Sequence, residues 1–468
     1  MSEPLPLDRP HRFSLLRAVF IALAVIVGVL GIFVVALASS SRVRVYTMQT
    51  TLKVMGADLQ HDERGFTNIL VLGTGDAQHD GADLTDTMIV ASIDPLHTRS
   101  VVLLSLPRDL YLDVNTRTGQ GRINAIYANE KYRFKRTGLT DEEASLKALD
   151  ALAEEIGERL GITIHGVIKA DFTAFVNVVD VVGGIDIDVP KTIIDYTYPI
   201  AEGRVGTFKI EEGMQHIDGE TALKYARSRH STNDFDRSAR QQQLLKSIAD
   251  KVRGMGRLAQ IRLIGAVQES LVDHVETTMT REELLGMAQL STELSMDRMI
   301  PMQINFNAGS DLSDAQAGGF VFPAPPEQFE GASILLPIAS PSGKNDWSQI
   351  KTFAQILIEH RDIYLHHPTL LIDNAGAKQL QAHRLRNELL RYGFDVLPTE
   401  TSDEKPTMTG STVFYRGSDA EDAATFIGQL LSIPIVEDTE TGSGDVIIRL
   451  GSGFGYEALQ TLSGAVLN

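Results

Sequence analysis

Stretches rich in apolar residues occur at three places in the first quarter of the chain, at residues 68–73, 87–94 and 100–106. Apolar runs of this length with polar residues on both sides are typical of buried strands. Pro95-Leu96-His97-Thr98 has the composition of a turn, so the second and third strands are predicted to be neighbours. We therefore expect the three strands to form an antiparallel meander.

After the three predicted strands, the apolar residues recur at the spacing of a helix. One stripe of a predicted amphipathic helix at 141–160 carries Leu146, Leu149, Leu152, Ile156 and Leu160. The pattern also predicts strands at 166–171 and 185–189, a helix at 241–253, and a mostly helical stretch at 273–302 that ends in an extended piece.

A second unit is predicted to begin near Pro368, after a loop-rich region with Pro, Gly and Ser clusters at 322–326 and 340–343. The pattern beyond Pro368 alternates between strand and helix. It predicts strands at 369–373, 394–397, 411–415 and 445–450, and helices at 377–392 and 419–431. The fold class is therefore α/β, with a small α/β domain at the C-terminus.

The N-terminal region contains an uncharged apolar run of 21 residues, from Ala18 to Ala38. As a helix it would be about 31 Å long, which is enough to cross a bilayer. A cleaved signal peptide is the alternative, because Ala36-Leu37-Ala38 has small residues at the spacing of a cleavage site. The run is longer than the apolar core of a signal peptide, which favours an uncleaved anchor with a cytoplasmic N-terminus and an extracytoplasmic bulk.

The overall charge limits the kinds of partner. The formal net charge is −18, which argues against a nucleic-acid-binding protein. Cysteine is absent, so disulfides and thiolate metal sites are excluded.

One local exception to the acidic composition lies at residues 225–241, which contain four arginines. Arg227 and Arg229 alternate and would share a face of an extended segment, whereas Asp234, Arg237 and Gln241 would share a face of a helix. Guanidinium groups grip phosphate oxygens in pairs. The cluster therefore predicts a binding site for a small phosphorylated anion, although structural ion pairs would explain Arg227 and Arg229 as well.

Three further charged residues are predicted to lie at the same edge of the meander, namely Asp76, Asp86 and Arg108. Paired carboxylates in loops suit Mg²⁺ or Mn²⁺, with water and substrate phosphate as the remaining ligands. The alternative is that each aspartate only forms a turn or caps an element. If the metal and the arginines meet, the combination suits phosphoryl transfer.

Several motifs in order resemble the LytR-CpsA-Psr family. They are NILVLGTGD, TDTMIVASIDP, VVLLSLPRDL, GRINAIYA, GVIKADFTAFVNVVDVVGGIDIDV, GMQHIDGETALKYARSRH and DFDRSARQQ. The resemblance implies a mixed sheet with flanking helices, and the C-terminal part resembles the small LytR-type domain. It implies a cytoplasmic tail at 1–17, a transmembrane helix at 18–38, a spacer at 39–65, a catalytic domain at 66–365 with its motif core at 66–250, and the LytR-type domain at 368–468.

The resemblance also implies a function. Family members are phosphotransferases in the cell membrane that move a glycopolymer from a polyprenyl-pyrophosphate carrier to peptidoglycan. Asp76 and Asp86 match the metal-binding aspartates. The residues that match the catalytic and substrate-binding positions are Arg108, Arg227, Arg229, Asp234, Arg237 and Gln241. The apolar sequence between Val167 and Val189 would wall a slot for the lipid chain, or simply fill the core.

Two positions depart from the family pattern. Leu84 stands where the family usually has an arginine, so one phosphate contact is missing, and Asp236 replaces the usual glycine before Arg237. Two alternatives therefore stay open beside the transferase: a hydrolase of the lipid pyrophosphate, and a non-catalytic scaffold that binds it.

Overall fold

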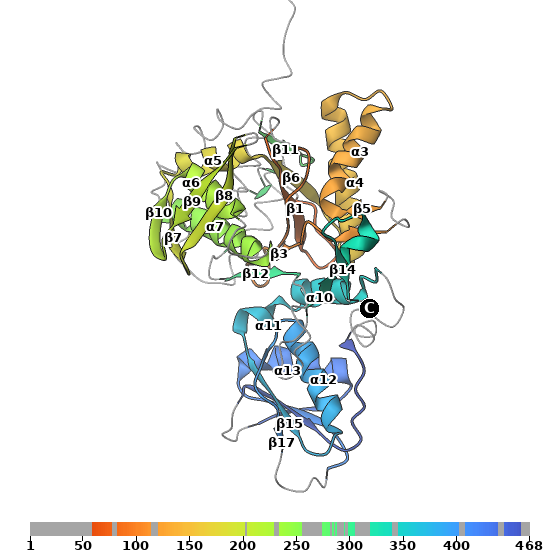
Figure 1. Cartoon of the computed structure of the whole chain (residues 1–468). Coiled ribbons are helices and arrows are strands. Elements are labelled where there is room, and N and C mark those ends of the chain that lie inside the picture. The colour runs from red at the N-terminus through yellow and green to blue at the C-terminus, as the bar shows by residue number, and fades with distance from the viewer. Residues whose placement is uncertain are drawn as a thin grey trace, which may run out of the picture. The chain divides into compact units, whose positions relative to one another are not determined.

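A computed structural model describes most of the chain beyond residue 58 (Figure 1). The described residues are 59–76, 82–113, 120–201, 204–228, 234–254, 274–280, 283, 284, 286, 287, 294, 298–304, 319–338, 345–401, 408–438 and 444–459. None of the helices within these ranges is long and apolar enough to cross a membrane. The predicted membrane helix at 18–38 lies outside the described residues.

The chain divides into two compact units. The first contains residues up to 108, 114–156 and 163–303, and the second contains 109–113, 157–162 and 304–468. The sequence pattern places the beginning of the C-terminal domain at Pro368, whereas the second compact unit already includes the loop-rich residues from Ile304 onward. Short strands in this region pair with each other, which the sequence pattern does not reveal.

A six-stranded mixed sheet forms the centre of the first unit, in the order β11-β6-β1-β2-β3-β12. The predicted meander is confirmed, because β1, β2 and β3 pair antiparallel in sequence order. β6 runs parallel to β1, and β12 runs parallel to β3. The strands are β1 (Thr67–Gly73), β2 (Thr87–Asp94), β3 (Ser100–Ser105), β6 (Gly166–Ala170), β11 (Val275–Thr277) and β12 (Met299–Gln303).

Helices cover both faces of this sheet. The main hydrophobic core lies on the face that carries Ile69, Ile89 and Ile168, where residues of α5, α6 and α7 pack. Tyr127 of α3 meets Lys169 of β6 on the opposite face, which α3 and α4 cover. The bounds are η1 (Ile123–Ala125), α3 (Ile126–Lys135), α4 (Asp141–Leu160), α5 (Phe172–Val181), α6 (Gly219–Arg227) and α7 (Asp234–Gly254).

α4 has the bounds that its apolar stripe predicts. Leu149, Leu152 and Ile156 are buried, as expected. A capping box begins the helix: the Thr140 hydroxyl accepts from the Glu143 N–H, and the Glu143 carboxylate accepts from the Thr140 N–H.

Two antiparallel ribbons lie next to α5, α6 and α7 (Figure 1). β7 pairs with β10, and β8 pairs with β9 through a ladder that contains two register shifts. The ribbon strands are β7 (Ile185–Val189), β8 (Ile193–Ala201), β9 (Arg204–Ile210) and β10 (Gly213–Ile217), and the short strands β4 (Tyr111–Leu112) and β5 (Gly121–Arg122) complete the first half of the chain.

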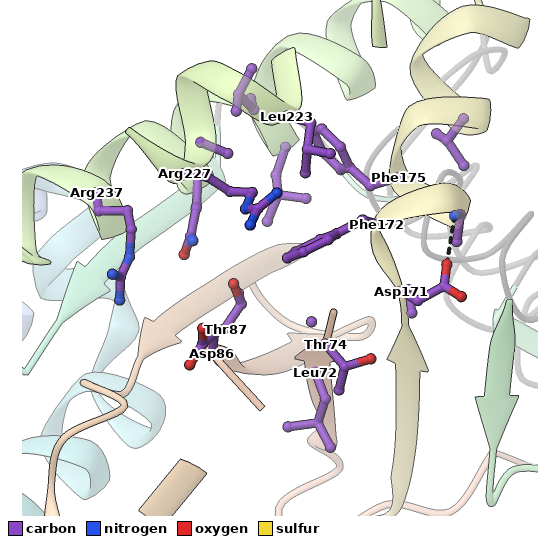
Figure 2. A pocket seen from close by; sticks show the side chains of 18 of the residues that line it. Leu72, Thr74, Asp86, Thr87, Asp171, Phe172, Phe175, Leu223, Arg227 and Arg237 are labelled. Atoms are coloured by element: carbon purple, nitrogen blue, oxygen red, sulfur yellow. Dashed lines mark hydrogen bonds between the residues drawn. The ribbon is translucent and has the colours of Figure 1, made fainter. Parts of the chain in front are cut away.

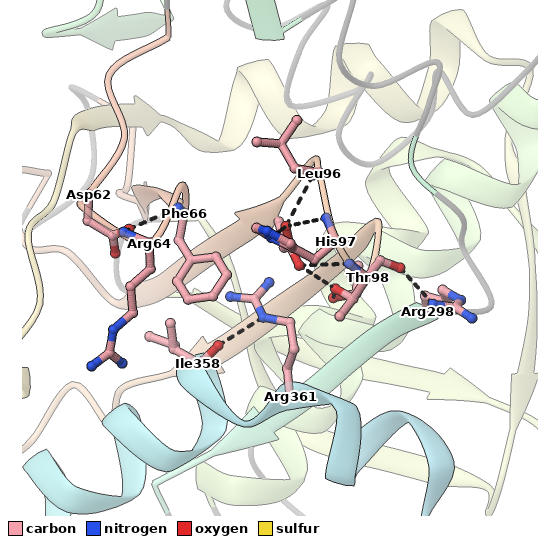
Figure 3. A network of polar contacts seen from close by, with 11 residues as sticks. Asp62, Arg64, Phe66, Leu96, His97, Thr98, Arg298, Ile358 and Arg361 are labelled. Carbon is pink, nitrogen blue, oxygen red and sulfur yellow. Dashed lines mark hydrogen bonds and ion pairs between the residues drawn. The ribbon is translucent and has the colours of Figure 1, made fainter. Parts of the chain in front are cut away.

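Figure 3 shows the predicted turn between β2 and β3. The Asp94 carboxylate accepts hydrogen bonds from the N–H groups of Leu96, His97 and Thr98, at 2.8 to 3.1 Å. Arg298 donates to the Thr98 carbonyl at 2.7 Å. A carboxylate that accepts hydrogen bonds from the backbone N–H groups of the turn fixes the connection between the two strands.

A glycine sets the distance between α5 and α6. A Cβ atom on Gly219 would lie 2.3 Å from the carbonyl oxygen of Val176, so a larger residue cannot occupy this position without a backbone shift. The Gly219 N–H donates to Asp180 at 2.7 Å. The start of α6 is therefore held directly against α5.

The second unit contains a sheet in the order β16-β15-β20-β18-β19, with β17 also paired to β15. The alternation predicted beyond Pro368 is confirmed, although the sequence pattern misses β17 and β19. The elements of this half are β13 (Val321–Pro323), η3 (Pro326–Phe329), β14 (Leu335–Pro337), α10 (Ser348–Glu359), α11 (Arg361–His366), β15 (Thr369–Asn374), α12 (Gln379–Arg391), β16 (Asp395–Val396), β17 (Glu400–Thr401), β18 (Thr412–Tyr415), α13 (Ser418–Leu431), β19 (Ile435–Glu437) and β20 (Val446–Leu450).

The prediction for residues 273–302 is wrong at its start. Val275–Thr277 is strand β11, which pairs antiparallel with β6 at the edge of the sheet. Val275 is buried in the main core. Tertiary pairing thus decides the conformation of a segment that has little helical or strand pattern of its own.

Candidate functional site

The meander brings Asp86 and Arg108 together, as the sequence predicts. Gly73 pairs with Thr87 and Ile89 pairs with Ser105, so the end of β1, the start of β2 and the end of β3 share one edge. An Arg108 guanidinium nitrogen lies 3.2 Å from an Asp86 carboxylate oxygen.

Asn124, which the sequence analysis overlooks, holds this edge in place. Its side-chain amide donates to Asp86 at 3.1 Å, and its backbone N–H donates to the Arg108 carbonyl at 3.3 Å. Its own carbonyl accepts from the Thr85 N–H at 3.0 Å. One buried residue therefore contacts both the Asp86 carboxylate and the backbone of Arg108.

Asp76 lies at the start of α5. Its carboxylate accepts from the Thr173 N–H at 3.0 Å and from the Thr173 hydroxyl at 3.2 Å. Asp171 caps the same helix by accepting from the Ala174 N–H at 2.8 Å. A carboxylate at a helix N-terminus is stabilised by the exposed N–H groups and the helix dipole. Capping, the alternative considered for the aspartates, is therefore part of what Asp76 does.

A cavity of about 620 Å³ opens between the sheet edge, the helices α5, α6 and α7, and the ribbon strand β8 (Figure 2). Most of its lining is apolar. These residues are Val71, Leu72, Ile89, Ala170, Phe172, Ala174, Phe175, Val178, Tyr198, Pro199, Leu223, Ala226, Leu244, Leu245 and Ile248. The charged and polar residues in the lining include Asp86, Thr87, Asp195, Arg227, Arg237 and Gln241. The cavity is therefore amphipathic.

Arg227 and Arg237 enter this cavity from α6 and α7 (Figure 2). The Arg227 guanidinium lies 4.1 Å from the centre of the Phe172 ring and 5.9 Å from that of Tyr198. Stacking on aromatic rings orients a guanidinium and leaves its edges for hydrogen bonds. Burial raises the pKa of Tyr198, and the nearby Arg227 charge opposes that rise.

The C-terminal end of α6, which carries Arg227, is fixed by Ser228. The Ser228 hydroxyl donates to Asp195 at 3.0 Å, and Arg240 of α7 donates to the Ser228 carbonyl at 2.5 Å. Arg240 also donates to the Tyr225 carbonyl at 2.9 Å. Arg240 thus has a structural part in the cluster, because it joins α7 to the end of α6.

The remaining predicted site residues are distributed as follows. Gln241 lines the cavity, one turn after Arg237 on α7, as its spacing predicts. Asp234 begins the same helix, but its side chain lies outside the described residues, as does the whole of Arg229. Leu84 is partly buried, and its carbonyl accepts from the Asp86 N–H at 3.1 Å.

Part of the segment that the sequence predicts as an apolar wall lines the cavity. Between Val167 and Val189, the cavity is lined by Ala170, Phe172, Ala174, Phe175 and Val178, whereas Ile185 and Ile187 belong to the core. The sequence pattern does not predict Phe172 as the stacking partner of Arg227, nor Asp195 and Tyr198 as lining residues. The strict alternation of polar and apolar residues around Asp195 was the available signal for its strand.

The residues present fit a magnesium ion only in part. Asp76 and Asp86 are hard oxygen donors of the kind that Mg²⁺ prefers. Within the part of the chain that the structure describes, no group of three or more His, Asp or Glu side chains converges as a complete metal site. Two carboxylates suffice for Mg²⁺ when water and substrate phosphate complete the shell. Asp86 belongs to the lining of the cavity, whereas Asp76 caps α5, so the fit stays partial.

The fold and the cavity define a class of protein: an α/β domain whose amphipathic cavity joins an apolar wall to a polar end with arginines and an aspartate. The profile of the LytR-CpsA-Psr (LytR_cpsA_psr) family matches residues 33–322. The chain belongs to this family. A second profile, described as LytR cell envelope-related transcriptional attenuator, matches residues 368–454.

The chain is similar in sequence to proteins whose names refer to peptidoglycan or to cell wall biosynthesis. The chain is 30% identical over 250 residues to the polyisoprenyl-teichoic acid–peptidoglycan teichoic acid transferase TagV of Bacillus subtilis, a match that covers 52% of this chain and 57% of TagV. It is 27% identical over 241 residues to the cell wall biosynthesis protein LcpA of Corynebacterium glutamicum, covering 48% and 44%. The chain thus spans about half the length of these relatives. The crystal structure of B. subtilis TagV is similar over 64% of this chain and 98% of that one, at 24% identity and a TM-score of 0.45.

Proposed function

We propose that this protein transfers a glycopolymer from a polyprenyl-pyrophosphate carrier to peptidoglycan. The observation that carries the proposal is the amphipathic cavity, whose apolar wall suits a prenyl chain and whose polar end, with Arg227, Arg237 and Asp86, suits a diphosphate. The relatives' names support it, because TagV is a transferase of teichoic acid from a polyisoprenyl carrier to peptidoglycan.

In the proposed reaction the acceptor hydroxyl oxygen attacks the phosphorus that is linked to the sugar. A new P–O bond forms, the P–O bond to polyprenyl phosphate breaks, and polyprenyl phosphate leaves with the electron pair. Arg227 and Arg237, together with Arg229 and Arg108, would stabilise the charge that develops on the phosphate oxygens. Asp234 would orient Arg237 or accept the proton of the acceptor hydroxyl.

Asp76 and Asp86 would hold Mg²⁺ or Mn²⁺, which supplies charge neutralisation at the diphosphate when bound. Asn124 would keep the Asp86 carboxylate in one orientation toward the ligand, and Gln241 would add a polar contact from α7. The stack of Arg227 on Phe172 would limit the rotation of the guanidinium, so little ordering is needed when substrate binds. In the cell, residues 18–38 would anchor the chain in the membrane with its bulk outside.

Product analysis tests the proposal. The full chain is incubated with lipid-linked polymer and Mg²⁺, with and without peptidoglycan. We expect polymer-linked peptidoglycan and polyprenyl phosphate only when the acceptor is present. Free polymer phosphate formed equally in both reactions would contradict transfer and indicate hydrolysis. If neither reaction shows turnover, even after Leu84→Arg supplies a further cation, the result would favour a protein that binds the lipid-linked polymer without catalysis.

A further inference from the structure

The outer face of the β8–β9 ribbon has unusual exposed apolar residues. Among the described residues of the first unit, Tyr196 is 64% exposed and Val205 is 61% exposed, although both lie on strands. We define the outer ribbon face as Ile194, Tyr196, Val205, Thr207 and Lys209. Exposed apolar side chains that gather on one element mark a contact surface more often than isolated ones do.

The opposite face of the same ribbon builds the core and the cavity. Phe208 and Ile210 are buried in the main core, and Asp195 and Tyr198 line the cavity. Tyr198 pairs with Gly206, the neighbour of Val205, so Tyr198 and Val205 lie on opposite faces of the ribbon. A single layer of backbone therefore separates the cavity wall from the outer ribbon face.

The charges on the outer ribbon face nearly cancel. Lys209 pairs with Glu211 at 2.6 Å, and both side chains are exposed. Attraction of this face to a surface would thus come mainly from its aromatic and aliphatic groups, with a lysine at its edge. Tyrosine beside aliphatic residues is the composition found where proteins meet the boundary between lipid tails and headgroups.

We propose that the outer ribbon face contacts the lipid bilayer and holds the cavity at the membrane surface. The inference rests on the proposed function in one respect: a polyprenyl chain does not cross water, so the wall of its cavity has to lie close to the bilayer. The ribbon that forms part of that wall exposes apolar groups on its outer face. The strongly acidic chain has no general attraction to anionic membranes, so a local apolar contact is needed.

The absence of cysteine from the chain makes a direct test available. Single cysteines replace Tyr196, Val205 or, as the matched control, Tyr132, which is 65% exposed on α3. Each full-length variant is labelled with nitrobenzoxadiazole and reconstituted into vesicles with or without doxyl-labelled phosphatidylcholine. Thermal unfolding identifies any variant that has lost its fold.

We expect doxyl lipid to quench the label at 196 and 205 at least threefold more than the label at 132. Equal quenching at all three positions would overturn the inference. As a second readout, Tyr196→Asp should lower transfer from a full-length polyprenyl carrier in vesicles several-fold, but leave transfer from a water-soluble short-chain carrier unchanged. An equal loss with both carriers would contradict a membrane role.

The two proposals fail in distinguishable ways. If transfer occurs but the labels at 196 and 205 are not quenched, the membrane contact is wrong and the proposed function stands. If the labels are quenched but no transfer is found with any carrier, the surface is supported and the proposed function is wrong.

Discussion

On the face of the sheet covered by α3 and α4, the Lys169 side chain is nearly buried and its ammonium has two hydrogen-bond partners. Its ammonium donates to Tyr127 at 2.9 Å and to Glu276 at 2.8 Å, and Ser145 hydrogen-bonds to both of these residues. Burial, with the charge of Glu276, raises the pKa of the Tyr127 hydroxyl. The four side chains thus form a ring of hydrogen bonds with one another.

On the opposite face, Arg227 lies at an open cavity. It stacks on Phe172 and borders about 620 Å³ of space that also meets Asp86 and Arg237. Both faces therefore hold cationic side chains beside the same sheet, but they use them differently. A cation enclosed by a matched carboxylate stabilises the fold, whereas a cation oriented by an aromatic ring beside a cavity is arranged for a ligand.

The largest effect is expected at Arg227. Arg227→Ala should reduce transfer at least 100-fold, because a guanidinium that stabilises developing phosphate charge is lost. Arg227→Lys should restore little, since an ammonium lacks the planar fork and the stack. Polymer transfer is measured by radiolabel, and circular dichroism melting serves as the control. Transfer at the unmodified rate would show that the cavity is not the reaction site.

Lys169 should show the opposite behaviour. Lys169→Met should lower the free energy of unfolding by about 2 kcal/mol, because Glu276 and Tyr127 lose their partner. Transfer by the folded fraction should stay within about threefold of the unmodified rate, which is smaller than a direct catalytic contribution. Urea unfolding and initial rates at low temperature separate the two quantities. A stable Lys169→Met protein without activity would contradict the claim that Lys169 contributes to stability and Arg227 to activity.

Asn124 lies behind the sheet edge that carries Asp86 and Arg108, so its effect should be intermediate. Asn124→Ala should lower transfer about tenfold, as expected for a residue that orients a ligand-binding carboxylate. The concentration of Mg²⁺ at half-maximal rate should rise, because Asp86 loses the bond that fixes it. Asn68→Ala is a control for a buried asparagine at the other end of β1. A slower rate with an unchanged Mg²⁺ requirement would argue against positioning of Asp86.

The smallest effect concerns stability and pH. Burial lowers the pKa of His165 from its ordinary 6.5, and its Nδ1 accepts from the Asn68 N–H at 2.9 Å. As the pH falls, His165 is therefore protonated in the unfolded chain before it is protonated in the folded protein. Its contribution to the free energy of unfolding is fully present above pH 6.5 and is lost as the pH drops toward the folded-state pKa. His165→Gln should flatten this fall. Urea unfolding at several pH values measures the slope; an unchanged slope would exclude His165.

Much of the charged edge was predictable because it depends on neighbouring strands. Three apolar runs with short connections predict the meander, and the meander alone brings Asp86 next to Arg108. The i and i+4 spacing on α7 likewise predicts that Arg237 and Gln241 share a face. These relations are local in sequence, so pattern and geometry suffice.

The walls of the cavity were not predictable in the same way. Phe172–Val181 is rich in valine, which favours strands, yet it is helix α5 because Asp171 caps it and the sheet buries its apolar face. Asn124 hydrogen-bonds through its side chain to Asp86, and Asp195 to Ser228, and both partners lie more than 30 positions away. No local pattern identifies such contacts, and the resemblance to the family motifs does not name them.

A crystal structure with geranyl pyrophosphate and Mg²⁺ tests the central claim most directly. We predict the diphosphate between Asp86 and the guanidinium of Arg227, with the ion on Asp76 and Asp86 and the prenyl chain against Phe175 and Leu245. A diphosphate bound at any other surface, with the cavity still empty at saturating ligand, would contradict the account.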